Sequence, residues 1–159
     1  MAGIRTGLVL IVAAALTACA TTGAATRSAA AQQNTAVVLA FLDTVYNKHE
    51  VAQAFRLYVA PHYQQHRRGA PEGNEAVIQA LTRMTHELYP GIRQEVKRTV
   101  AQGDLVAVHS RYIRNQADRD SGGGQAAVDI FRLERNRIVE HWDVVEDAAS
   151  GSTNDNEVF

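Results

Sequence analysis

The sequence predicts an α+β fold in which helices pack on one face of an antiparallel sheet. Apolar residues recur at three- and four-residue spacing between residues 37 and 84, which is typical of amphipathic helices. After Gly91 the period changes to two, which is typical of strands. Helices followed by a run of strands is the order expected of an α+β domain. A chain of 159 residues, 46% of them hydrophobic, can form one domain with a buried core.

Three helices are expected in the first half of this domain. The first is capped by Asn34 or Thr35, and Pro61 closes the region of the second. Asn74 caps the third, which ends before the turn at residues 90–91. The predicted helices therefore cover residues 34–46, 51–57 and 74–89.

Four strands are expected in the second half, separated by turn signals. The three consecutive glycines at 122–124 lie between two of these strands and lack the spacing of a phosphate-binding loop, so we interpret residues 118–124 as a surface loop. The predicted strands cover residues 94–101, 105–115, 125–133 and 138–146.

The turn between the last two strands decides which polar residues share a face. A two-residue turn would place Leu133 opposite Ile138 and would separate Asp129 from Asp143. A three-residue turn with Asn136 in the left-handed conformation would bring the two aspartates together. Because asparagine tolerates that conformation, the sequence favours the second register. This register groups Asp129, Phe131, Val139, His141 and Asp143.

Two carboxylates and an imidazole on an otherwise apolar face form a candidate site for acid–base chemistry. One group can remove a proton from a carbon acid while another stabilises the resulting oxyanion. The alternative is that the histidine and the aspartates form a structural or solvent-exposed hydrogen bond. His109 on the second strand, and Tyr63, Gln65 and His66 before the third helix, are further candidates for lining the pocket.

Other classes of site are not favoured. Sixteen basic against 17 acidic residues give no basic footprint, so no nucleic-acid partner is expected. His62 and His66 have helical spacing, but a metal site needs three or four ligands and no third lies nearby in sequence. We expect neither a metal nor a cofactor.

The first 18 residues resemble a secretory signal peptide. Arg5 precedes a short apolar run, which is shorter than the roughly 20 residues that span a bilayer. The segment 16–19 (LTAC) resembles a bacterial lipobox, in which Cys19 becomes the lipidated first residue of the mature protein. Ala20 after the cysteine then implies the outer membrane, facing the periplasm. The alternative is an ordinary signal peptide with an incidental cysteine.

The remaining chain divides into three parts. Residues 19–33 are rich in Ala, Thr, Ser and Gln without an apolar face, and are interpreted as a flexible tether. The domain covers residues 34–147, and residues 148–159 form a flexible polar tail.

The domain also resembles a known family. The segments 63–66 (YQQH), 103–109 (GDLVAVH) and 128–146 (VDIFRLERNRIVEHWDVVE) are similar to the SnoaL-like branch of the nuclear transport factor 2-like superfamily. The resemblance implies a cone-shaped half-barrel, with helices packed into a strongly curved sheet that encloses an apolar pocket. It also implies aldol cyclisation without a metal or cofactor, with Asp143 as the acid/base residue.

Three functions remain open, because this fold carries many. The first is a cofactor-independent cyclase or isomerase acting on a small apolar carbonyl compound. Its catalytic residues would be Asp143, His66, His109 and Asp129, with Tyr63, Gln65, Phe131 and His141 binding the substrate. The second is a non-catalytic, lipid-anchored binding protein, which the signal sequence favours. The third is a homodimeric structural protein of the envelope that uses the outer sheet face, where Trp142 is expected.

Overall fold

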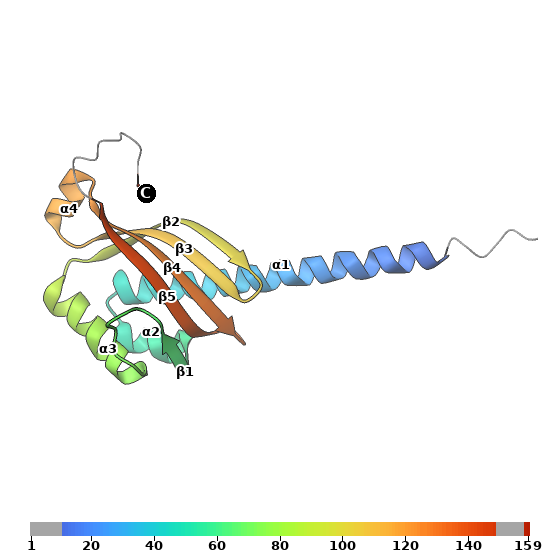
Figure 1. The fold of residues 1–159 in the computed structure, drawn as a ribbon, viewed down its shortest axis with the longest axis horizontal. Coiled ribbons are helices and arrows are strands. Elements are labelled where there is room, and N and C mark those ends of the chain that lie inside the picture. The colour runs from blue at the N-terminus through green and yellow to red at the C-terminus, as the bar shows by residue number, and fades with distance from the viewer. Residues whose placement is uncertain (1–10, 149–157) are drawn as a thin grey trace, which may run out of the picture.

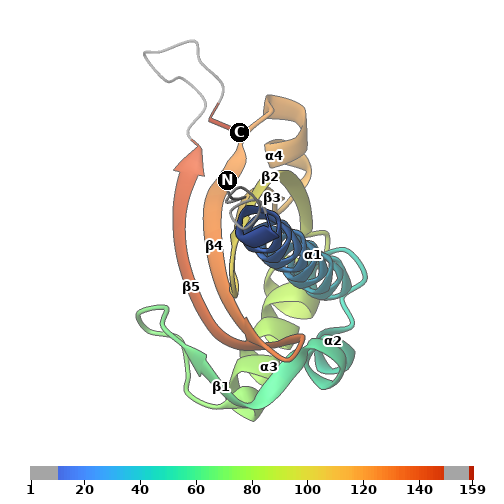
Figure 2. The same cartoon turned by 90° about the vertical axis from the view of Figure 1, so that its right-hand side faces the viewer.

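A computed structural model describes residues 11–148 and 158–159, with side chains from residue 28 onward. The fold is α+β, as predicted: helices pack on one face of a curved, open, five-stranded sheet (Figure 1). Viewed along the first helix, strands β2 to β5 curve around it (Figure 2). The elements in chain order are α1 Ile11–Tyr46, α2 Val51–Tyr58, β1 Val59–Gln65, α3 Asn74–Arg83, a π-helical turn Met84–Leu88, β2 Arg93–Gln102, β3 Leu105–Ile113, α4 Gln116–Ser121, β4 Gly124–Glu134 and β5 Arg137–Ala148.

Helix α1 is much longer than predicted. It begins at Ile11, before the cap expected at Asn34 or Thr35, and extends away from the body of the domain (Figure 1). The segment 19–33 is therefore helical where we expected a tether. Its many alanines have high helix propensity. The prediction of a tether rested only on the absence of an apolar face in this segment. Within the described part of the chain, no helix combines the length and hydropathy needed to cross a membrane.

Strand β1 was not predicted. It contains Pro61 and pairs in parallel with the edge of β5, which gives the strand order β1-β5-β4-β3-β2. Proline is tolerated there because an edge strand needs hydrogen bonds on one side only. The segment lacks the apolar alternation that predicts a strand, and its partner lies more than 70 residues away in the sequence.

The hairpin of β4 and β5 combines the two registers that the sequence left open. The turn has two residues, Arg135 and Asn136, both with positive φ, and Leu133 faces Ile138. The favoured three-residue turn is therefore wrong. A β-bulge at Val139, however, supplies one extra residue, so that Asp129 still pairs with Asp143. Without this shift, every later side chain of β5 would point to the opposite face.

The core lies between α1 and the concave face of the sheet. Val38, Phe41, Leu42 and Val45 of α1 pack against inward-facing side chains of β3, β4 and β5. The outer sheet face keeps exposed apolar side chains within the described residues, namely Val100, Leu105, Val128, Ile130 and Val144. The fold therefore places inward residues of β4 and β5 beside the helices.

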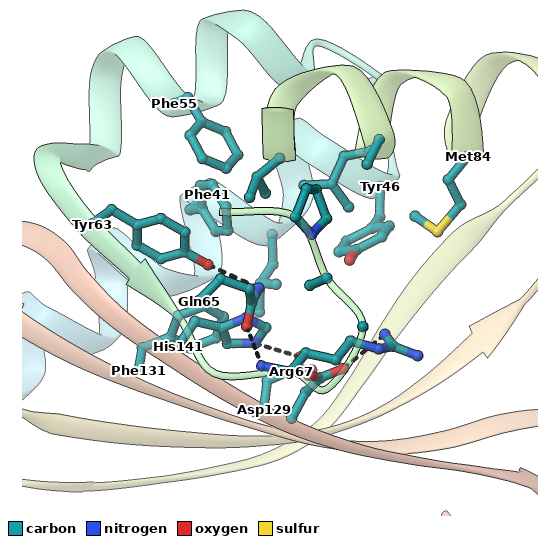
Figure 3. Close-up of a pocket in the computed structure, with 18 of the residues that line it drawn as sticks. Phe41, Tyr46, Phe55, Tyr63, Gln65, Arg67, Met84, Asp129, Phe131 and His141 are labelled. Carbon is teal, nitrogen blue, oxygen red and sulfur yellow. Dashed lines mark hydrogen bonds and ion pairs between the residues drawn. The ribbon is translucent and has the colours of Figure 1, made fainter. Parts of the chain in front are cut away.

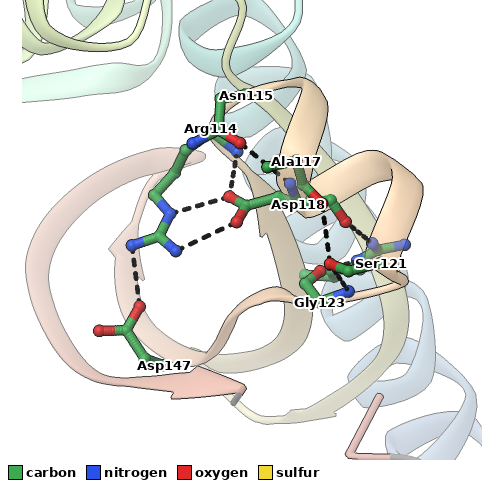
Figure 4. Close-up of polar contacts among 8 residues, drawn as sticks. Arg114, Asn115, Ala117, Asp118, Ser121, Gly123 and Asp147 are labelled. Carbon is green, nitrogen blue, oxygen red and sulfur yellow. Dashed lines mark hydrogen bonds and ion pairs between the residues drawn. The ribbon is translucent and has the colours of Figure 1, made fainter. Parts of the chain in front are cut away.

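The glycine-rich connection between β3 and β4 contains a short helix, α4, in place of the irregular loop that we expected. The side chain of Asn115 accepts a hydrogen bond from the backbone N–H of Asp118, which caps the helix (Figure 4). Arg114 binds the Asp118 carboxylate at 2.9 Å and Asp147 at 2.8 Å. These contacts tie the connection to the end of β5.

Candidate functional site

A cavity of about 270 Å³ lies between the helices and the concave face of the sheet. Aromatic and aliphatic side chains line its helical side, whereas polar groups from β1, β4 and β5 gather at the sheet (Figure 3). The apolar lining comprises Phe41, Leu42, Phe55, Val77, Ala80, Leu81, Met84 and Phe131.

The β4–β5 hairpin supplies the polar centre of the cavity. The bulge turns His141 and Asp143 inward, opposite Phe131 and Asp129 respectively. His141 stacks on the ring of Phe131 with the ring centroids 4.5 Å apart. These four predicted residues do line one cavity, and Val139 of the predicted group is buried at the bulge without lining it.

His141 links β4 to β1. Its Nε2 lies 3.0 Å from Oδ1 of Asp129, which is buried, and its Nδ1 lies 2.9 Å from the Gln65 amide nitrogen. The other oxygen of Asp129 lies 3.4 Å from the Tyr112 hydroxyl. Both nitrogens of the imidazole are therefore held, and the ring cannot turn without breaking a hydrogen bond.

The hydrogen-bond directions determine the role of each ring nitrogen of His141. The backbone N–H of Arg67 lies 3.0 Å from Oε1 of Gln65, and an N–H group can only donate. The amide nitrogen of Gln65 must therefore face His141 and donate to Nδ1, which must be an acceptor. The proton of a neutral His141 then resides on Nε2, where it is donated to Asp129.

Asp143 is the least satisfied polar group in the cavity. Its Oδ2 accepts a hydrogen bond from Arg67 at 2.8 Å. Its Oδ1 is buried and has no hydrogen-bond partner among the residues that the structure describes. Burial is the main cause that raises the pKa of Asp143, while the Arg67 guanidinium acts in the opposite direction. Such a carboxylate is a better proton acceptor than a solvated one.

The variant Asp143→Asn is expected to raise the free energy of unfolding at neutral pH. Folding raises the pKa of this carboxyl above its ordinary 3.8, so the folded protein binds the proton more tightly than the unfolded chain does. The carboxyl therefore contributes its full stability below pH 3.8, and the folded state loses that stability as the pH rises. An asparagine stays neutral throughout. Its lost contact to Arg67 costs little, because the Arg67 side chain is 55% exposed.

Urea unfolding of both proteins, at neutral pH and below pH 3.8, measures this effect. The variant's advantage should be present at neutral pH and disappear in acid. Greater stability of the wild type at neutral pH would contradict the assignment of Asp143 as a strained, buried carboxylate.

Two predicted catalytic residues lie elsewhere. His66 stacks on Trp142 with centroids 4.5 Å apart and binds Glu140 at 2.9 Å, on the outer side of β5. His109 lies between the inward-facing Val108 and Ser110, so strand alternation turns it outward. Neither histidine lines the cavity. The prediction that they line the pocket is therefore wrong.

The remaining predicted residues line the cavity together with groups that the prediction missed. Tyr63 and Gln65 come from β1 and are joined by a 3.0 Å hydrogen bond. The segment 67–71 forms a further wall, and its Arg67 binds Asp143. Arg67 was missed because its role depends on a contact 76 residues along the chain. Behind the cavity, Gln94 donates hydrogen bonds to Ser110 and Tyr112 at 3.0 Å each. Ser110 and Tyr112 lie two residues apart on β3 and therefore share one face, and this spacing in the sequence could have indicated the buried polar cluster.

Comparison with known proteins decides the family. The family described as SnoaL-like polyketide cyclase matches residues 36–152. The chain belongs to this family. None of the curated proteins matches the sequence at a significant level.

Solved structures share the SnoaL-like fold at low sequence identity. Wild-type IdmH from Streptomyces antibioticus, named in its structure as a polyketide cyclase, is 19% identical with a TM-score of 0.59, covering 72% of this chain and 92% of IdmH. A protein from Jannaschia sp. CCS1, named as a SnoaL-like polyketide cyclase, is 21% identical with a TM-score of 0.59, covering 74% and 88%. An NTF2-like protein of unknown function from Cytophaga hutchinsonii is 18% identical with a TM-score of 0.57, covering 71% and 89%. These likenesses support the cone fold.

Proposed function

We propose that this chain binds a small, largely apolar carbonyl compound and that Asp143 removes a proton from the carbon next to the carbonyl group. The Oδ1 of Asp143, which is buried beside an apolar cavity and has no partner in the described part of the chain, carries this proposal. An unsatisfied buried carboxylate oxygen costs stability, and such a cost is typical of a functional group retained for its chemistry.

The surrounding groups support a base rather than a nucleophile or a metal ligand. Arg67 holds one oxygen of Asp143 and thereby fixes the direction of the other. Within the described residues, no group of three or more metal-ligating side chains is present. His141, held in place by Gln65 and Asp129, completes a polar wall that can face a carbonyl group. The family and the name of IdmH favour an aldol cyclase or isomerase type of reaction.

Deuterium uptake by a ketone tests the proposal. The probe is 2-tetralone, an apolar bicyclic ketone with acidic hydrogens beside the carbonyl group. In deuterated buffer the wild-type protein should accelerate exchange at that carbon, and Asp143→Asn should lower the rate roughly 100-fold or more, the range lost with a general base. Glu146→Gln, which changes an exposed carboxylate on the same strand, is the matched control and should keep the wild-type rate.

The second candidate is a binding protein without turnover. The contact between Arg67 and Asp143 favours it, because this ion pair would have to weaken before Asp143 became fully basic. Equal binding of the ketone by wild type and Asp143→Asn, without exchange in either, would leave this function and exclude the first.

We further propose that Cys19 carries a lipid anchor that holds the domain at the periplasmic face of the outer membrane. The apolar run of residues 7–16 and the LTAC segment directly before Ala20 support this proposal. Cys19 belongs to the residues whose side chains the structure does not describe.

A further inference from the structure

The hydroxyl group of Tyr63 is the feature that the acid–base proposal leaves unused. Tyr63 is buried on β1 and lines the cavity together with Asp143. Its ring packs edge-on against Phe55 with centroids 5.8 Å apart, which fixes the direction of the hydroxyl group.

The neighbouring amide determines what this hydroxyl can do. The oxygen of Gln65 is occupied by the Arg67 N–H, so its NH₂ group provides two donors. One donor is used on Nδ1 of His141 at 2.9 Å, and the other on the Tyr63 oxygen at 3.0 Å. Tyr63 is therefore an acceptor toward Gln65, and its own hydrogen must point elsewhere.

That hydrogen has no acceptor among the residues that the structure describes, where Gln65 is the one hydrogen-bond partner of the Tyr63 hydroxyl. Burial raises the pKa of Tyr63, so the group remains a neutral phenol at all physiological pH values. The cavity thus contains a free donor on Tyr63 and a free acceptor on Asp143. A carbonyl compound with an acidic neighbouring C–H matches this pair, because it offers one acceptor and one proton.

We infer that Tyr63 donates a hydrogen bond to the carbonyl oxygen of the bound compound and stabilises the negative charge that develops there. The inference rests on the proposed function and extends it, since it assigns the site for the oxyanion.

The reaction step balances without a further reactant. Asp143 takes the proton from the carbon, the electron pair of the C–H bond forms the new carbon–carbon double bond, and the carbonyl oxygen becomes the enolate oxygen. Tyr63 keeps its proton and donates a hydrogen bond to that oxygen. Return of a proton or deuteron from Asp143 to carbon regenerates the ketone.

Infrared spectroscopy of bound 2-tetralone with a ¹³C-labelled carbonyl group tests Tyr63 directly, because a hydrogen bond lowers the carbonyl stretching frequency. We expect a lowered frequency in the wild type and in Asp143→Asn, and return toward the frequency in apolar solvent in Tyr63→Phe. Tyr89→Phe, a similar change at a partly exposed tyrosine away from the cavity lining, is the control and should leave the frequency lowered.

Exchange kinetics give the second measurement. Tyr63→Phe should lower the rate constant for deuterium exchange about 100-fold, the loss typical of one oxyanion donor, while the affinity for 2-tetralone changes less than tenfold. A fold that is merely loosened would weaken binding as well. Gln65→Leu removes the donor to the Tyr63 oxygen but keeps the phenol, so it should retain the lowered frequency.

The two measurements separate the proposals. Exchange without a frequency difference between wild type and Tyr63→Phe would overturn the role of Tyr63 and leave Asp143 as the base. A frequency difference without exchange would support Tyr63 as the carbonyl donor in a binding protein and overturn catalysis. Failure of 2-tetralone to bind would contradict both.

Discussion

Phe131→Ala is expected to lower the free energy of unfolding by about 3–5 kcal/mol, the range typical of removing a large aromatic ring from a core. Phe131 is 1% exposed and lies at the centre of the inward face of β4. Its ring contacts Phe41 edge-on, with centroids 6.0 Å apart, and stacks on His141. The rigid sheet and helix around it cannot close the gap, so the cavity should enlarge.

Urea or thermal unfolding measures the loss, and Ile130→Ala is the matched control. Ile130 is the preceding residue on the same strand, but its side chain is on the outer face and 37% exposed, so its truncation should cost about 1 kcal/mol or less. Equal losses at the two positions would contradict the assignment of faces in β4, and with it the inward direction of Asp129.

Gly124→Ala is the second change with a large expected effect, a loss of about 3 kcal/mol or more. Gly124 has φ of +117°, a conformation that other residues rarely adopt. A Cβ atom there would lie 2.3 Å from the backbone carbonyl oxygen of Tyr112, which belongs to β3 and cannot rotate away. The start of β4 would have to separate from β3, which disturbs the hydrogen bonds of Arg111 to this connection.

The variant Gly122→Ala separates the stability cost of the steric clash from the cost of the backbone conformation. Gly122 also has positive φ, +72°, but a Cβ there meets nothing within 4 Å. Its substitution should therefore cost only the left-handed strain of about 1–2 kcal/mol. Thermal unfolding of both variants gives the comparison, and a loss at Gly122 as large as that at Gly124 would exclude the contact with Tyr112 as the cause.

Helices α2 and α3, the part of α1 after residue 34 and the four antiparallel strands could be predicted because their signals are local. Apolar spacing marks residues 37–46 as one helical face, and alternation marks inward residues of β4. Helix α1 before residue 34 and strand β1 could not be predicted in the same way. The first depends on helix propensity without an apolar face, and the second on pairing with a strand that follows much later.

The candidate site shows the same division. Asp129, His141 and Asp143 were found because polar residues on an apolar strand face are visible in the sequence, although the turn that groups them was assigned wrongly. His66 was misplaced because successive side chains at the end of β1 point to alternate sides of the sheet beside β5. Gln65 and Arg67 therefore point toward the cavity, whereas His66 points outward. That alternation requires knowledge of β1, which the sequence did not indicate.

The length of α1 changes how a lipid on Cys19 would position the protein. Asn34 is bound to the backbone of Gly103 at the tip of the β2–β3 hairpin, so the helix is fixed to the domain from there. The 15 helical steps between Cys19 and Asn34 span about 22 Å at a rise of 1.5 Å per residue. A flexible chain would allow every height and tilt. A helix would instead hold the domain at a fixed distance from a lipid on Cys19. The cavity would then meet compounds at a defined height above the membrane surface rather than within the membrane.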